Sequence, residues 1–73
     1  MKTLDLHGVK HADVPKVLDQ FLWEQIQKKS KEAEIITGVS SAMVELVIKN
    51  LKDYDFTYNE AWKNPGRLIV KLS

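Results

Sequence analysis

The chain contains no cysteine, so neither a disulfide nor a thiolate metal site can stabilise it. It also lacks long apolar runs, and none approaches the roughly 20 residues that a helix needs to cross a bilayer. Because Met1 and Lys2 lead directly into the first apolar segment, we expect no signal peptide. These absences are compatible with a reducing compartment, and we expect a cytoplasmic location.

A large excess of positive charge is missing as well. The 11 lysine and arginine residues face 10 aspartate and glutamate residues, which gives a formal net charge of +1. Proteins that bind nucleic acid through their overall field are strongly basic. Binding of that kind would therefore have to depend here on a local arrangement of groups.

With 73 residues, of which 44% are hydrophobic and 29% charged, the sequence is typical of one small globular domain. We expect that single domain to span residues 1–73. A chain of this size buries only about 60% of its unfolded surface, so its core is small, and a homo-oligomer is one way to enlarge it.

Apolar spacing predicts the first four elements. Residues 4–7 form a short strand, and a helix follows that begins between Ala12 and Val14, with Asp13 as its N-cap, and ends near residues 29–31. Residues 33–37 form a second strand, which Gly38 ends. A second helix then begins at a cap provided by Ser40 or Ser41. The apolar stripe of the first helix has helical periodicity and consists of Val14, Val17, Leu18, Phe21, Leu22 and Ile26.

After residue 53 the period changes to two. Residues 54–60 and 67–72 alternate as strands, and Asn64, Pro65 and Gly66 between them are typical of a turn. The order βαβαββ predicts an α+β fold, a two-layer α/β sandwich. Its four-stranded mixed sheet has a parallel first pair, an antiparallel last pair and both helices on one face. The other face is open or covered by a partner, and on it we expect Asp5, His7, Arg67 and Lys71, with Thr37 beside them.

The strand end at residues 5–8 has the sequence Asp-Leu-His-Gly. Side chains alternate across a strand, so the carboxylate of Asp5 and the imidazole of His7 should sit side by side. Gly8 permits a tight turn directly after them. An acid and a base at such a corner favour proton transfer or phosphate chemistry, whereas the alternative is a pair of solvated surface residues.

The chain resembles the small MutS-related (Smr) domain over essentially its whole length. The resemblance rests on Leu-Asp-Leu-His-Gly at residues 4–8, Leu-Asp-Gln-Phe-Leu at 18–22, Glu-Ile-Ile-Thr-Gly at 34–38 and the Gly-started apolar strand at 66–72. Smr domains bind nucleic acid, and several are nicking or structure-selective endonucleases on DNA or RNA. The resemblance also implies a fold similar to the C-terminal domain of translation initiation factor 3.

The resemblance implies a catalytic or substrate-contacting role for Asp5 and His7. Asp5 would act as general base or hold a divalent ion such as Mg²⁺, and His7 would act as proton donor or polarise the phosphate. Gly38 matches the first glycine of a central family motif, but Thr37 stands where the family usually has histidine, and Ser40 where it has a second glycine. These departures leave two alternatives open: a non-catalytic nucleic-acid-binding domain, or a protein-interaction module.

The remaining polar groups near these motifs are candidates for nucleic-acid contact. Together with the residues above they give the predicted binding set Gly8, Lys10, His11, Thr37, Gly38, Ser40, Ser41, Arg67 and Lys71. A metal site formed by His7 and His11 would lack an evident third ligand, so a solvated loop position is favoured for His11. Trp23 and Trp62 suit either packing or base stacking.

Overall fold

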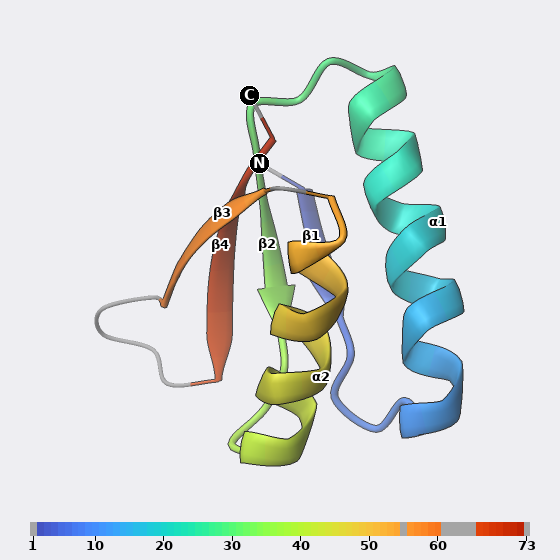
Figure 1. Ribbon diagram of the computed structural model, residues 1–73, viewed down its shortest axis with the longest axis vertical. Coiled ribbons are helices and arrows are strands. Elements are labelled where there is room, and N and C mark those ends of the chain that lie inside the picture. The colour runs from blue at the N-terminus through green and yellow to red at the C-terminus, as the bar shows by residue number, and fades with distance from the viewer. Residues whose placement is uncertain (1, 55, 61–65, 73) are drawn as a thin grey trace.

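The computed structural model describes residues 2–54, 56–60 and 66–72, and it confirms the predicted element order (Figure 1). A short 3₁₀ helix (His11–Asp13) precedes the first α-helix. The elements are β1 (Lys2–Asp5), α1 (Val14–Gln27), β2 (Glu32–Ile36), α2 (Ser41–Lys52), β3 (Thr57–Glu60) and β4 (Arg67–Lys71). Neither helix is long and apolar enough to cross a membrane within these described ranges.

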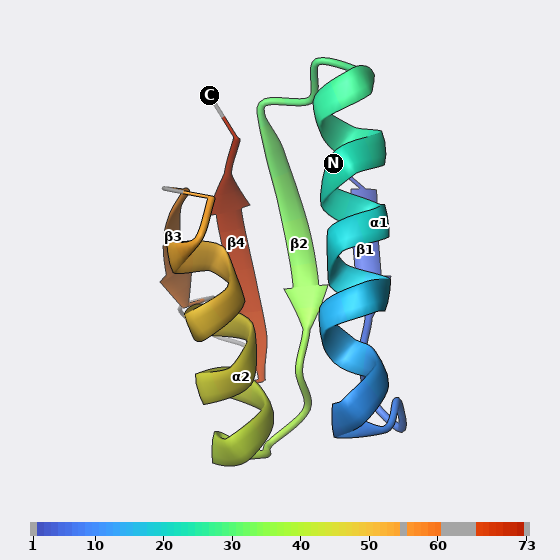
Figure 2. The same ribbon diagram turned by 45° about the vertical axis from the view of Figure 1, so that its right-hand side comes forward.

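The strands form one mixed sheet in the order β1-β2-β4-β3. β1 runs parallel to β2, whereas β4 is antiparallel to both β2 and β3. Figure 2 shows α1 and α2 next to each other on the same side of this sheet. The predicted α+β sandwich, with a parallel first pair and an antiparallel last pair, is therefore confirmed.

The core lies between the helices and one face of the sheet. Ala33 and Ile35 of β2 and Leu68 and Val70 of β4 are buried there, as the two-residue period of a strand requires. The helices contribute fully buried side chains at helical spacing, chiefly Leu18, Leu22, Val47 and Leu51. Burying each such side chain contributes about 1.5–3 kcal/mol, so this layer holds the sheet and its loops in place.

The ends of the two helices agree only in part with those predicted from the sequence. α1 ends at Gln27, earlier than predicted, because Lys29 adopts a left-handed conformation with φ 57°. Next to this end, the ammonium of Lys28 pairs with the carboxylate of Glu24 at 2.9 Å. Asp13 occupies the N-cap position of α1 without a side-chain capping bond, whereas the Oγ of Ser40 accepts the N–H of Met43 at 3.2 Å and caps α2.

The aromatic segment after α2 departs from the predicted strand 54–60, because β3 begins only at Thr57. The N–H of Tyr54 bonds to the carbonyl of Leu51, which prolongs the helix end instead of a sheet ladder. The rings of Tyr54 and Phe56 stack with centroids 5.5 Å apart. The predicted turn at Asn64 and Pro65, and Trp62 before it, lie outside the described residues.

Candidate functional site

A cleft of about 590 Å³ lies where the parallel strands β1 and β2 end. Both strands reach this end of the sheet with their carboxyl termini (Figure 1). Residues of the loops that follow them line the cleft. Clefts in this position are the usual ligand sites of sheets with parallel strands, and the volume suits a nucleotide-sized group. We call it the β1–β2 cleft; its lining consists of Leu6, His7, Gly8, Val9, His11, Thr37, Gly38, Val39, Ser40 and Met43.

Three chain segments meet at close range beside this cleft. A Cβ placed on Gly38 would lie 3.3 Å from Cδ2 of His7, so the imidazole lies against the Gly38 backbone. The carbonyl oxygen of Gly66 accepts the N–H groups of Thr37 at 2.6 Å and of Gly38 at 3.1 Å. The start of β4 therefore fixes the loop after β2, and that loop supports His7.

The sequence prediction placed Thr37 on the open face of the sheet, and this placement is wrong. Thr37 has the same parity as Ala33 and Ile35, and only 3% of its surface is exposed. The single O–H of Thr37 is shared between two carbonyl oxygens, that of Gly66 at 2.9 Å and that of Gly38 at 3.0 Å. Thr37 lines the cleft, and its hydroxyl is bonded to the backbone of the Gly38 and Gly66 segments.

Asp5 and His7 are both exposed while Leu6 between them is buried, as strand alternation predicted. β1 ends at Asp5, and Oδ1 of Asp5 accepts the backbone N–H of His7 at 2.8 Å, which turns the chain out of the strand. Between these two described residues there is no hydrogen bond or ion pair from carboxylate to imidazole. His7 lines the cleft, whereas Asp5 does not and acts on it through the backbone of His7.

The two cations predicted on the open face, Arg67 and Lys71, lie at opposite ends of β4. Asp5 is paired with Ile36, and Ile36 with Arg67, so Arg67 lies at the same end as the cleft. Its guanidinium is 3.3 Å from the carboxylate of Glu34. Lys71 is paired with Glu32, four residues and roughly 13 Å farther along β4. Lys71 shares the face of Arg67 but not its end, and the structure does not bring it to the site.

A second hollow lies on the other side of the loop that carries Gly8 and Val9. Its volume is about 480 Å³, and it contains Lys10, which does not line the β1–β2 cleft. Gly8 and Val9 border both hollows, so the two are adjacent. We call this hollow the α1 groove, and its other lining residues are Asp13, Lys16, Val17 and Gln20.

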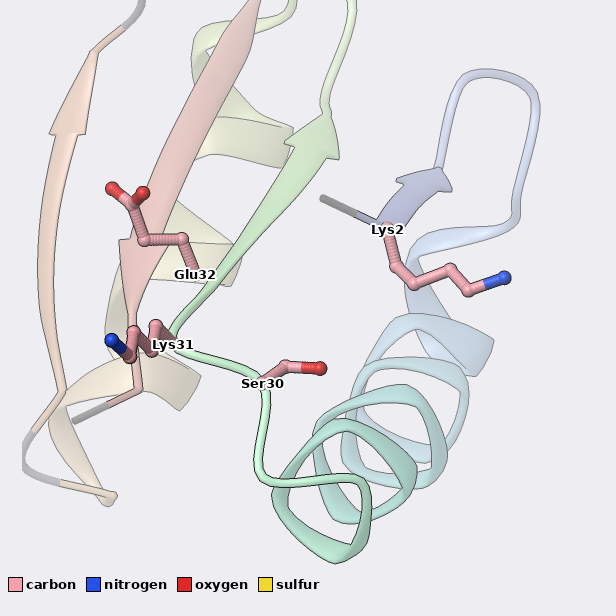
Figure 3. Close-up of a pocket in the computed structure, with 4 residues that line it drawn as sticks. All are labelled: Lys2, Ser30, Lys31 and Glu32. Carbon is pink, nitrogen blue, oxygen red and sulfur yellow. The ribbon is translucent and has the colours of Figure 1, made fainter.

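A further hollow of about 310 Å³ lies at the opposite end of the sheet, between Lys2 and the residues that begin β2. Figure 3 shows that its charged side chains do not converge. Lys2 points away from Glu32 and Lys31, which extend to the other side. A binding site needs groups aimed at one point, so this hollow lacks the arrangement of a binding site.

The described residues contain no group of three histidine, aspartate or glutamate side chains that could share one metal ion. Asp5 offers one exposed carboxylate, of which Oδ1 already accepts a hydrogen bond. Mg²⁺ is commonly held by one or two carboxylates together with substrate phosphates and water. A divalent ion at this site would therefore depend on Asp5 and the substrate together.

Sequence reasoning missed several residues that shape the site. Val9, Val39 and Met43 line the cleft, although they were assigned no ligand contact, and Val39 is 92% exposed. Gly66 was interpreted only as a turn residue and the start of the last strand. A glycine at the first position of a strand can indicate a close backbone approach, and this was the available signal.

The model of the Smr domain family matches residues 4–73, which is essentially the whole chain. No curated protein and no solved structure matches the chain, so its likeness to the C-terminal domain of translation initiation factor 3 stays a prediction. On the family match, this chain belongs to the Smr domain family, whose members are domains of a nucleic-acid-binding and endonuclease type.

Proposed function

We propose that the chain binds nucleic acid and that the β1–β2 cleft receives a phosphate of the backbone. The observation that carries this proposal is the position of His7, an exposed imidazole lying against Gly38 at the carboxyl ends of β1 and β2. α2 begins directly after this loop, capped by Ser40. The first N–H groups of a helix and its dipole favour an anion at that point.

Cleavage of the bound strand is the finer part of the proposal. In it, His7 transfers a proton at the phosphate, because imidazole is the side chain that changes charge near neutral pH. Asp5 holds the backbone of His7, and its free oxygen is the place for a divalent ion such as Mg²⁺, which would neutralise phosphate charge when bound. The buried hydroxyl of Thr37 keeps the Gly38 loop in position.

Binding without cleavage is a second candidate, favoured by Thr37, which stands where the family usually has histidine and whose hydroxyl is bonded to backbone carbonyls. A protein-interaction or homo-oligomer role is the third, favoured by Trp23 and Ile26. These α1 residues are 64% and 39% exposed, and residues three apart on a helix are neighbours. If this third role is correct, sedimentation should show self-association that Trp23→Ser abolishes.

A panel of single-stranded, duplex and branched DNA and RNA, with and without Mg²⁺ or Mn²⁺, tests the proposal. We expect binding to at least one of these at low salt, and cleavage that falls about 10²–10⁴-fold in His7→Ala. Lys31→Gln, at the opposite end of the sheet, is the control and should bind and cut like the wild type. If no nucleic acid binds at low salt, the proposed function is wrong.

A further inference from the structure

We propose that His11 is a second catalytic residue and that, with His7, it cleaves RNA through the 2′-hydroxyl group of the substrate. This inference rests on the proposed function and adds the substrate class and the second proton carrier. The chain has two histidines in total, and both line the β1–β2 cleft. A cleft with two imidazoles can serve both proton transfers of a phosphodiester cleavage.

The loop between the two histidines is held by short-range hydrogen bonds. The N–H of His7 is bonded to Asp5, and the N–H of Val9 donates to the carbonyl of Leu6 at 3.0 Å. Gly8, with φ +85°, supplies the turn. At the far end of the loop the N–H of Asp13 donates to the carbonyl of Lys10 at 2.9 Å, which forms the 3₁₀ helix that begins with His11. Both imidazoles are therefore carried by defined turns.

The reaction needs one base and one acid. A neutral imidazole takes the proton from the 2′-hydroxyl, and the 2′-oxygen attacks the adjacent phosphorus. The bond from phosphorus to the 5′-oxygen breaks, and the second imidazole, protonated beforehand, gives its proton to that oxygen. The products are a 2′,3′-cyclic phosphate and a free 5′-hydroxyl. One imidazole takes up the proton of the 2′-hydroxyl and the other releases a proton to the 5′-oxygen, so no water or other co-reactant is consumed.

This chemistry selects RNA over DNA. DNA lacks the 2′-hydroxyl that acts as nucleophile, so a DNA strand can occupy the same cleft without being cut by this route. The cleft volume of about 590 Å³ accommodates one phosphate with its flanking sugars, and the apolar wall formed by Leu6, Val9 and Met43 suits the less polar parts of an unpaired nucleotide.

The test uses the purified chain with a fluorescent single-stranded RNA and with the same strand carrying 2′-deoxy sugars. We expect the RNA to be cut to a 2′,3′-cyclic phosphate in the presence of EDTA, and the deoxy strand to be bound but left intact. His7→Ala and His11→Ala should each reduce cleavage about 10²–10⁴-fold. The double variant should lose little more, because the two groups act as a unit.

Two further measurements separate catalysis from loop structure. Free imidazole in the buffer should restore part of the activity of His11→Ala, which a purely structural role of His11 would not allow. Ala12→Ser, in the same 3₁₀ helix, is the control and should cut like the wild type. Far-ultraviolet circular dichroism and melting of each variant establish that it is folded.

Several outcomes would overturn the inference while leaving nucleic-acid binding intact. These are full cleavage of RNA by His11→Ala, equal cleavage of the deoxy strand, a product with a 5′-phosphate, or a wild type that binds RNA without cutting it. A wild type that binds no nucleic acid would overturn the proposed function itself.

Discussion

A methyl group on Gly66 would lie 2.7 Å from the carbonyl oxygen of Gly38 and 2.8 Å from its carbonyl carbon. These are backbone atoms, so they cannot move aside as a side-chain end can. The same glycine accepts the N–H groups of Thr37 and Gly38 through its own carbonyl. At the residue scale, the shape of the cleft thus depends on a backbone contact between two loops that are 28 positions apart.

Gly66→Ala should therefore cost more stability than Gly8→Ala. Both glycines have positive φ, +88° and +85°, so alanine is strained at either position by about 1–3 kcal/mol. A Cβ on Gly8 meets nothing within 4 Å, so Gly8→Ala measures this strain alone. Urea unfolding of both variants gives the difference, which is the cost of the close approach. Equal costs would contradict the contact between Gly66 and Gly38.

Single residues were the least predictable part of the site. His7 and Gly38, which line the cleft, could be proposed from the sequence because the motifs that contain them are local. Strand alternation placed Asp5 and His7 on the exposed side of the chain, but it could not predict that the Asp5 carboxylate accepts the N–H of His7 where β1 ends. Whether a strand continues depends on hydrogen bonds to its neighbours. Thr37 was misplaced because one position separates the buried face from the open face.

At the element scale, the first helix is joined to the segment that follows the second. The phenol O–H of Tyr54 donates to the carboxylate of Asp19 in α1. This bond, together with partial burial, raises the pKa of Tyr54 to about 12 from an ordinary value of 10. Neutral tyrosine is therefore favoured in the folded protein, and above pH 10 the unfolded chain binds fewer protons than the folded one.

Stability that depends on Tyr54 should be complete below pH 10 and be lost as the pH rises from 10 to 12. The difference in free energy of unfolding between the wild type and Tyr54→Phe should shrink over that window, because other titrating groups cancel in the difference. Asp19→Asn removes the carboxylate and should show the same loss of pH dependence. Parallel curves for the wild type and Tyr54→Phe between pH 9 and 12 would contradict this account.

The element order was predictable because each helix buries one apolar stripe and each strand alternates. The ends of elements were less so. Tyr54 and Phe56 follow a strand period, yet stacking of their rings and the bond to Asp19 hold them outside β3. The bond to Asp19 joins residues that are 35 positions apart, so no local pattern indicates it.

At the scale of the whole molecule, the chain with its net charge of +1 carries lysines at both ends of the sheet. Lys10 and Lys16 line the α1 groove next to the β1–β2 cleft, and neither forms an ion pair with another described residue. Lys31 and Lys71 lie at the opposite end of the sheet. There Lys71 of β4 is the strand neighbour of Glu32 in β2, and the N–H of Leu72 donates to the carbonyl of Lys31. The two pairs of lysines have equal charge and different distances from the cleft.

We therefore expect Lys10 and Lys16, next to the cleft, to contribute to the salt dependence of nucleic-acid binding, and Lys31 and Lys71 to contribute nothing to it. For a single strand, each neutralised phosphate contributes about −0.7 to the slope of log K against log salt, and we expect about two to four such contacts in the wild type. Lys10→Gln with Lys16→Gln should make this slope shallower by about 1.4. Between 50 and 200 mM salt, the variant would then lose about sevenfold less affinity than the wild type.

Lys31→Gln with Lys71→Gln removes the same charge from the far end and should leave the slope unchanged. Fluorescence anisotropy at several salt concentrations measures both. Equal changes in the two double variants would mean that binding follows overall charge, and the α1 groove would then have no particular part in it.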